Sequence, residues 1–383
     1  MKTGCGDMLR LKNWIVLLLV AGALWHFYGE TYEYSGFQGV FHEIKEDVNE
    51  FIESPIVTST VTTIKQEFQI LMARLSDYKE NDDTKPAPVL EKPKLNEPTN
   101  QTFSIHNIEI GDTKSDVEAR VGSAKRSSMN EYGVEWNSYH ENYQNFLMVA
   151  YDNNDRVAGL YTNQDLLSST NDINFSSSRE SVLSTLEEPL TAIRKGLVRY
   201  QIQNDGENDT FFIDDNYVTI FYDKHENNTV TAIQIITDEL EQQKNDYFGK
   251  PSAELKDGLE YQLFDLTNAA RVVHGLSVLT WEESLRNTAR DHSTDMADQN
   301  YFSHTNLEGQ SPFDRMKEDD IVFRIAGENL ATGQPSSIFA HEGLMNSLGH
   351  RENILKKDFE SLAVGVAFNK NSQPFYTENF LTK

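Results

Sequence analysis

Three residues in the last third of the chain carry side chains that could bind a ligand or a metal ion: His304, Glu328 and His350. Two neutral imidazoles and one carboxylate are a sufficient ligand set for Zn²⁺ with one open coordination position, as in hydrolytic zinc sites. The gaps of 24 and 22 residues between them are not a local ligand motif, so spacing alone does not indicate a metal. The trio could equally be a structural network in which Glu328 orients a histidine.

Nucleophilic catalysis has little support in the sequence. Ser303 and Ser347 lie close to histidines, but no order of acid, base and nucleophile can be identified around them. The only cysteine of the chain is Cys5, which precedes the apolar N-terminal run. An intramolecular disulfide and a cysteine-based zinc site are therefore both excluded.

Amphipathic helices must position these residues. A helix is predicted over about 254–274, because apolar residues recur there at helical spacing. The segment Thr280–Glu283 has the pattern of a capping box, which predicts the start of a second helix. His292 falls on the apolar stripe of that helix, so we expect a buried and hydrogen-bonded core histidine. Strand patterns follow at 362–368 and 375–380.

Several ordered motifs over roughly 260–383 resemble the CAP superfamily, which includes cysteine-rich secretory proteins, plant pathogenesis-related proteins of class 1 and bacterial SCP-like proteins. The motifs are Asn268-x-x-Arg271, Phe302-Ser-His304, Gly327-Glu-Asn-Leu330 and Ser347-x-Gly-His350-Arg-x-Asn-Ile-Leu355. The resemblance implies an α+β domain over 254–383, built as a three-layer α-β-α sandwich with a cleft on one side.

In many members of that superfamily, two histidines and two glutamates line the cleft and can hold a divalent metal. The resemblance assigns His304, Glu328 and His350 to three of these positions, and it places Asn329 beside them. The second glutamate falls near Ser347, so that ligand is missing. Glu342 lies on the same expected helix but more than one turn away. The resemblance implies Zn²⁺ or another divalent cation as the cofactor that His304, Glu328 and His350 would hold.

Residues 103–240 contain two similar halves, each with a short Ser/Thr-capped helix followed by alternating strands. The offset between matching positions drifts from 65 to about 73 residues, as insertions in turns would produce. We interpret 103–245 as a tandem-repeat α+β domain, which resembles the CAP-associated N-terminal domain found beside bacterial SCP domains. It contains no catalytic constellation, and its isolated His140 and His225 are expected to be exposed loop histidines.

The N-terminal residues predict a membrane anchor. A basic segment at 1–12 precedes an apolar run, which places the N-terminus in the cytoplasm and the remainder outside. We favour an uncleaved single-span anchor at 13–29 over a cleaved signal peptide, which would release a secreted protein. An amphipathic helical stalk is expected at 30–78 and a proline-rich spacer at 79–102, where four of the ten prolines fall.

The formal net charge of −26 argues against nucleic acid as a partner, because phosphate binding requires a clustered basic surface.

Three functions are then open. The first is a non-catalytic cell-envelope protein whose cleft binds a lipid, a peptide or a wall-derived fragment. The second is a metal-dependent hydrolase of peptide or cell-wall material with His304, Glu328 and His350 as ligands. The third is a structural component that assembles through its stalk.

Overall fold

The computed structural model describes residues 90–202 and 205–383, which belong to a compact unit that begins at Pro86. The expected anchor at 13–29, the stalk at 30–78 and the first part of the spacer lie outside the described residues. Within the described ranges, no helix has the length and apolarity that crossing a membrane would require.

Seven strands form one antiparallel sheet in the first part of this unit: β2 (Arg126–Met129), β3 (Glu135–Glu141), β4 (Gln144–Tyr151), β5 (Val157–Thr162), β9 (Asn208–Ile213), β10 (Asn216–Asp223) and β11 (Thr229–Thr237). Their order is β2-β3-β4-β5-β11-β10-β9, so β5 pairs with β11 where the two halves meet. Two short pairs lie outside the sheet: β1 (Phe103–Ile105) with β6 (Leu167–Ser169), and β7 (Ala192–Lys195) with β8 (Val198–Gln201).

Both expected halves of the repeat are present. Helix α3 (Lys114–Val121) is capped by the side chain of Thr113, and α4 (Arg179–Thr185) is capped by Ser178. Each capping residue also forms a β-bridge to the start of the last strand of its half, Thr113 to Arg156 and Ser178 to Thr229. The caps are 65 residues apart and their bridge partners 73, which reproduces the drift in the sequence.

The end of the proline-rich spacer expected at 79–102 is bound to the repeat module. Its residues from 90 to 102 form no regular element, but the backbone amides of Thr99, Asn100 and Gln101 donate hydrogen bonds of 2.7–2.9 Å to the carboxylate of Glu109. One carboxylate therefore satisfies three consecutive backbone donors. This local contact, which proline content does not encode, holds the segment against the repeat module.

The second part of the unit contains a four-stranded sheet with the order β12-β14-β15-β13. Its strands are β12 (Thr280–Trp281), β13 (Ile325–Thr332), β14 (Ser361–Phe368) and β15 (Pro374–Thr382). The helices of this part are α6 (Ala253–Val273), α7 (Glu283–Gln299), α8 (Pro312–Glu318), α9 (Ser337–Asn346) and α10 (Leu348–Ile354), and α5 (Asp238–Gln243) precedes them. The predicted helix at 254–274 and the predicted strands at 362–368 and 375–380 are confirmed.

Helices cover both faces of the four-stranded sheet. Side chains alternate along β14, so that Val364 packs with Leu259 of α6, whereas Ala363 packs with Leu285 of α7. Helices α6 and α7 therefore lie on opposite faces. The α+β class is confirmed, and this part is arranged as a helix layer, a sheet and a second helix layer.

The predicted capping box at Thr280–Glu283 is wrong. Thr280 and Trp281 form a parallel strand against Ser361 and Leu362, and α7 begins at Glu283 without a side-chain cap. The indole of Trp281 donates to the carboxylate of Glu283 at 2.6 Å, so this glutamate does not reach back to a threonine amide. Pairing with β14 has overridden the local capping preference.

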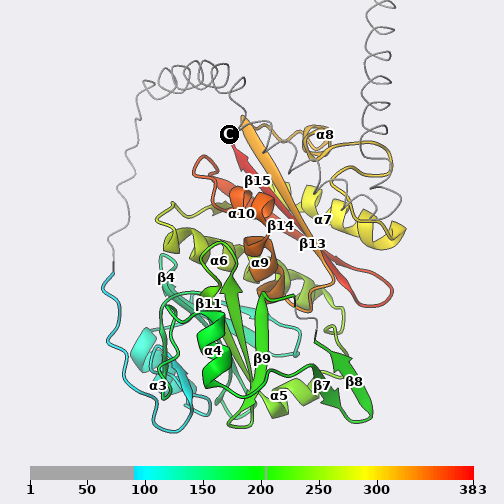
Figure 1. The fold of residues 1–383 in the computed structure, drawn as a ribbon. Coiled ribbons are helices and arrows are strands. Elements are labelled where there is room, and N and C mark those ends of the chain that lie inside the picture. Colours follow the sequence, from blue (N-terminus) through cyan, green and yellow to red (C-terminus); the bar gives the residue numbers. More distant parts are fainter. Residues whose placement is uncertain (1–89, 203–204) are drawn as a thin grey trace, which may run out of the picture. The chain divides into compact units, whose positions relative to one another are not determined.

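Helices α6 and α9 form a layer that the two parts of the chain share (Figure 1). Alternate residues of β4 face two different cores. Leu147 and Val149 pack with α3 and α4, whereas Met148 packs with α6 and α9. The second of these cores joins the seven-stranded sheet to Leu266 of α6 and Ile338 of α9. The repeat module and the C-terminal domain therefore pack through a buried apolar interface.

Candidate functional site

His304 and Glu328 are brought together at the edge of the four-stranded sheet. His304 lies in the loop after α7, and Glu328 lies on the edge strand β13. The Nδ1 atom of His304 is 2.9 Å from Oε1 of Glu328. The other carboxylate oxygen, Oε2, accepts a hydrogen bond of 2.7 Å from Nη2 of Arg315 on α8. The Glu328 side chain is 1% exposed and that of Arg315 9%, so this ion pair is buried.

His350 approaches the same edge from the opposite helix layer. It lies on α10, and its Nδ1 atom is 2.7 Å from the hydroxyl of Ser347, the residue between α9 and α10. Burial lowers the pKa of His350, and the charge of His304 lowers it further. Asn353 of the same helix donates to the backbone carbonyl of Glu328 at 3.3 Å, so α10 packs against the strand that carries Glu328. The structure therefore places His304, Glu328, Ser347 and His350 in one neighbourhood.

Asn329 belongs to a buried layer beneath this neighbourhood. It is fully buried, and its Nδ2 atom donates to the backbone carbonyl of His350 at 3.2 Å and to Oε2 of Glu378 at 3.0 Å. The other oxygen of Glu378 accepts from Thr267 of α6 at 2.9 Å. Since Asn329 is inaccessible, we assign it a positioning role for α10 in place of the ligand contact that the sequence suggested.

Two further contacts fix the loop that carries His304. His292 is 1% exposed, and its Nε2 atom lies 3.0 Å from the carbonyl of Ser303, which confirms the predicted hydrogen-bonded core histidine. Arg315 donates to the carbonyl of His304 at 2.9 Å in addition to pairing with Glu328. The imidazole of His304 is therefore held in place although its side chain is 51% exposed.

The residues at the site do not fit the expected metal ion. Both oxygens of Glu328 are already bonded, and the guanidinium of Arg315 places a positive charge where a divalent cation would need a ligand. Ser347 offers a neutral hydroxyl that is committed to His350. In the described parts of the chain, no group of three His, Cys, Asp or Glu side chains has the geometry to hold a metal. We therefore derive no chemistry through a metal.

Glu342 cannot replace the missing ligand. It is buried on α9 against the repeat module, where it accepts a hydrogen bond of 2.7 Å from the hydroxyl of Tyr161. Burial raises its pKa to about 7.

The two isolated histidines of the repeat module also have partners. His225 is exposed but its ring contacts the carbonyl of Asn346, whereas His140 lies half-buried at the end of β3 and stacks on Tyr143. His140 is thus wrongly predicted as an exposed loop residue.

Sequence reasoning missed Arg315 and Glu378, which complete the two networks. Arg315 lies outside the motifs of the resemblance, and its partner Glu328 is 13 residues away in the chain. Glu378 is one of several residues in a strand pattern, and its partner Thr267 is 111 residues away. Neither residue carries a local signal, because only the assembled sheet and helices bring the partners together.

The buried carboxyl of Glu378 predicts a pH-dependent stability. Burial raises its pKa from 4.5 to about 7. Between these values the unfolded chain loses a proton that the folded chain keeps, so the free energy of unfolding falls as the pH rises, by at most about 1.4 kcal/mol per pH unit. Glu378→Gln, which stays neutral, should therefore be more stable relative to the parent chain at about pH 8 than at about pH 5. Urea unfolding at both pH values measures this, and an identical difference at both would contradict it.

Comparison with known proteins assigns both parts of the chain. Residues 110–247 match the model of the CAP-associated N-terminal family, and residues 264–380 match that of the cysteine-rich secretory protein family. The uncharacterized membrane protein YlbC of Bacillus subtilis (strain 168) is 29% identical over 298 residues, which are 72% of this chain and 82% of YlbC. The uncharacterized protein YkwD of the same organism is 41% identical over 124 residues, 32% of this chain and 47% of YkwD.

Two solved structures share the fold of the described unit. An extracellular protein containing an SCP domain from Bacillus anthracis superposes with a TM-score of 0.63 at 26% identity, covering 77% of this chain and all of that one. A cysteine-rich secretory protein from Staphylococcus aureus superposes with a TM-score of 0.58 at 14% identity, covering 75% of this chain and 98% of that one, which shows the fold alone. The chain therefore contains a CAP-associated N-terminal domain followed by a CAP domain of the cysteine-rich secretory protein family.

Proposed function

We propose that this chain is a membrane-anchored extracytoplasmic protein whose CAP domain binds a peptide or wall-derived ligand of the cell envelope without catalysis. The names of two relatives support the location, since YlbC is called a membrane protein and the similar protein of Bacillus anthracis an extracellular one. The apolar run at 13–29 would supply the anchor, and the two domains would lie outside the cell.

The arrangement of Glu328 carries the proposal that the site binds and does not catalyse. Both oxygens of Glu328 already accept a hydrogen bond or contact His304, and the positive charge of Arg315 makes the carboxylate a weaker base and opposes a bound cation. What the site offers to a ligand is the half-exposed imidazole of His304 and the partly exposed His350, both held in fixed positions. Preorganised hydrogen-bonding groups of this kind favour selective binding.

Exposed apolar side chains close in sequence to both histidines favour a peptide over a lipid. Phe302 and Leu348 each precede one of the two histidines by two residues, and they are 50% and 60% exposed. A ligand held here would meet imidazole donors and acceptors together with separate apolar side chains. Peptides combine both kinds of group along one chain, whereas a lipid tail would leave the imidazoles unpaired.

The two other functions have less support. A metal-dependent hydrolase would require the ligand set that Arg315 and Ser347 interrupt. A structural role in envelope assembly depends on the stalk at 30–78, which lies outside the described residues.

Co-sedimentation of the 86–383 fragment with purified cell-wall sacculi tests the proposal. We expect retention that is equal in EDTA and in added zinc, and that is lost in the variant His304→Ala/His350→Ala. Lys125→Ala is the control, because this half-exposed side chain lies in the repeat module, where it pairs with Glu141, and its loss should leave retention unchanged.

Three results would count against binding at this cleft. They are retention by lipid vesicles but not by sacculi, retention only when zinc is present, and retention that survives loss of both histidines. The second result would favour the metal-dependent hydrolase instead.

A further inference from the structure

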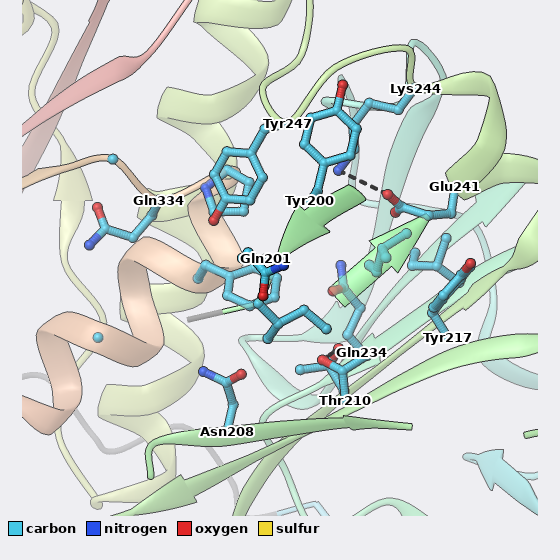
Figure 2. Close-up of a pocket in the computed structure, with 18 of the residues that line it drawn as sticks. Tyr200, Gln201, Asn208, Thr210, Tyr217, Gln234, Glu241, Lys244, Tyr247 and Gln334 are labelled. Atoms are coloured by element: carbon cyan, nitrogen blue, oxygen red, sulfur yellow. Dashed lines mark hydrogen bonds and ion pairs between the residues drawn. The ribbon is translucent and has the colours of Figure 1, made fainter. Parts of the chain in front are cut away.

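A second cavity lies where the repeat module meets the CAP domain, away from His304 and His350. Its volume is 310 Å³, at the lower end of the range of about 300–1,000 Å³ that is typical of small-molecule sites. Strands β9, β10 and β11 and the β7–β8 hairpin line one side, whereas Gln334 and Phe339 of the CAP domain line the other. Figure 2 shows this cavity, with Gln334 on the opposite side from Tyr217.

Three amide side chains around this cavity have hydrogen-bonding atoms without a partner. Gln234 is 2% exposed, and its Nε2 donor is buried and unpaired. The Oδ1 acceptor of Asn208 and the Oε1 acceptor of Gln334 are buried and unpaired as well. An unpaired buried polar atom costs about 1–3 kcal/mol, so three at one cavity indicate that a ligand supplies the missing bonds. That ligand must both donate and accept.

Aromatic rings are the second component of the lining. Four tyrosines contribute to it: Tyr132, Tyr200, Tyr217 and Tyr247. Their rings offer flat apolar faces that can pack against the C–H face of a ring, while their hydroxyls add polar contacts. Two hydroxyls of the lining, those of Thr210 (labelled in Figure 2) and Thr219, lie 2.9 Å apart. The lining therefore suits a compact ligand that carries several hydroxyl or amide groups.

Charge pairing at the cavity disfavours an anionic ligand. The lysines Lys195 and Lys244 both contact Oε1 of Glu241, at 2.7 and 3.5 Å. Glu207, which also lines the cavity, is paired with Lys224 at 2.7 Å. Asp205 also lines the cavity, so the three carboxylates balance the three lysines, and a further negative charge would find no excess cation.

We propose that this interdomain cavity binds a neutral N-acetylated sugar. An acetamido carbonyl would accept from Gln234, the sugar hydroxyls would donate to Asn208 and Gln334, and the tyrosines would pack on the ring. The site is separate from the CAP cleft and does not depend on the function proposed for that cleft. The contact between the two domains would then form a binding site, because neither domain alone supplies the whole lining.

Titration of the 86–383 fragment with N,N′-diacetylchitobiose, followed by nuclear magnetic resonance, tests this proposal. We expect saturable binding with a dissociation constant of about 1 mM or lower. Gln234→Leu should weaken it by about tenfold or more, because it removes the donor for the acetamido carbonyl. The same variant should melt at an unchanged or higher temperature, since its amide nitrogen has no partner to lose.

Gln334→Ala, on the CAP-domain side of the cavity, is the second variant and should also weaken binding. His304→Ala should leave binding intact, which separates this site from the CAP cleft. Absence of saturation, an affinity unchanged from the parent in both cavity variants, loss of binding in His304→Ala, or tighter binding of the anionic probe digalacturonate would each overturn the proposal.

Discussion

Replacing Arg315 with methionine is expected to destabilise the 86–383 fragment by about 3–5 kcal/mol. Methionine keeps an unbranched apolar stem similar to that of arginine but removes the guanidinium that faces Glu328. The buried carboxyl of Glu328 would then lose the hydrogen-bond partner of its Oε2 atom. The substitution also removes two hydrogen bonds, one to the carbonyl of His304 and one to that of Gln310. Urea unfolding at neutral pH measures the loss.

Two controls separate the buried charge from other effects of this substitution. Lys125→Met breaks an ion pair with Glu141 of similar length, 2.9 Å, but both of its side chains are about half exposed, so the effect should be far smaller. The double variant Arg315→Met/Glu328→Gln removes both charges and should recover most of the stability that Arg315→Met loses. An Arg315→Met variant as stable as Lys125→Met would mean that Glu328 is not a buried anion.

The outcome bears on function as well as on stability. If Arg315 neutralises the charge of Glu328, the site is polar but carries no free carboxylate charge. A metal ion would then have to displace a buried arginine before it could bind. If Arg315 does not pair with Glu328, then His304, Glu328 and His350 include the unpaired carboxylate that a metal site needs. The same substitution therefore distinguishes the two leading functions through the charge state of one side chain.

Much of the fold could be predicted because its signals are local. The helix over 254–274 follows from apolar residues that recur every three or four positions, and the structure begins and ends this helix within a residue of the prediction. The repeat in 103–240 could be recognised because each half keeps its capping residue and its final strand. The cap at Thr280 failed for the opposite reason, since strand pairing with Ser361, 81 residues away, outweighed a local preference.

The site could be located from the sequence, but its chemistry could not. Histidines and a glutamate in three motifs mark the cleft, whereas the state of Glu328 depends on Arg315, which no motif contains. The same holds for the cavity between the domains. Gln234 has the appearance of an ordinary strand residue in the sequence, and only the packed structure reveals that its amide nitrogen is unpaired.

Replacing Gly258 with alanine is expected to destabilise the unit by about 2–3 kcal/mol. Gly258 lies on α6 where this helix crosses the edge strand β2 of the repeat module. A Cβ atom at this position would be 2.0 Å from the carbonyl oxygen of Met129 and 2.9 Å from its backbone nitrogen. These are backbone atoms of a paired strand, so they cannot move aside as the end of a flexible side chain could. The helix and the repeat module would have to separate.

The matched control is Gly349→Ala on α10, where a Cβ atom would meet no atom within 4 Å. Alanine is favoured over glycine in helices by about 1 kcal/mol, so this variant should be neutral or slightly more stable. The same preference applies at Gly258, so the loss of stability expected for Gly258→Ala is the steric cost minus this gain. Equal stability of the two variants in urea unfolding would show that α6 does not approach β2 so closely, and the shared helical layer would then be looser than the contact requires.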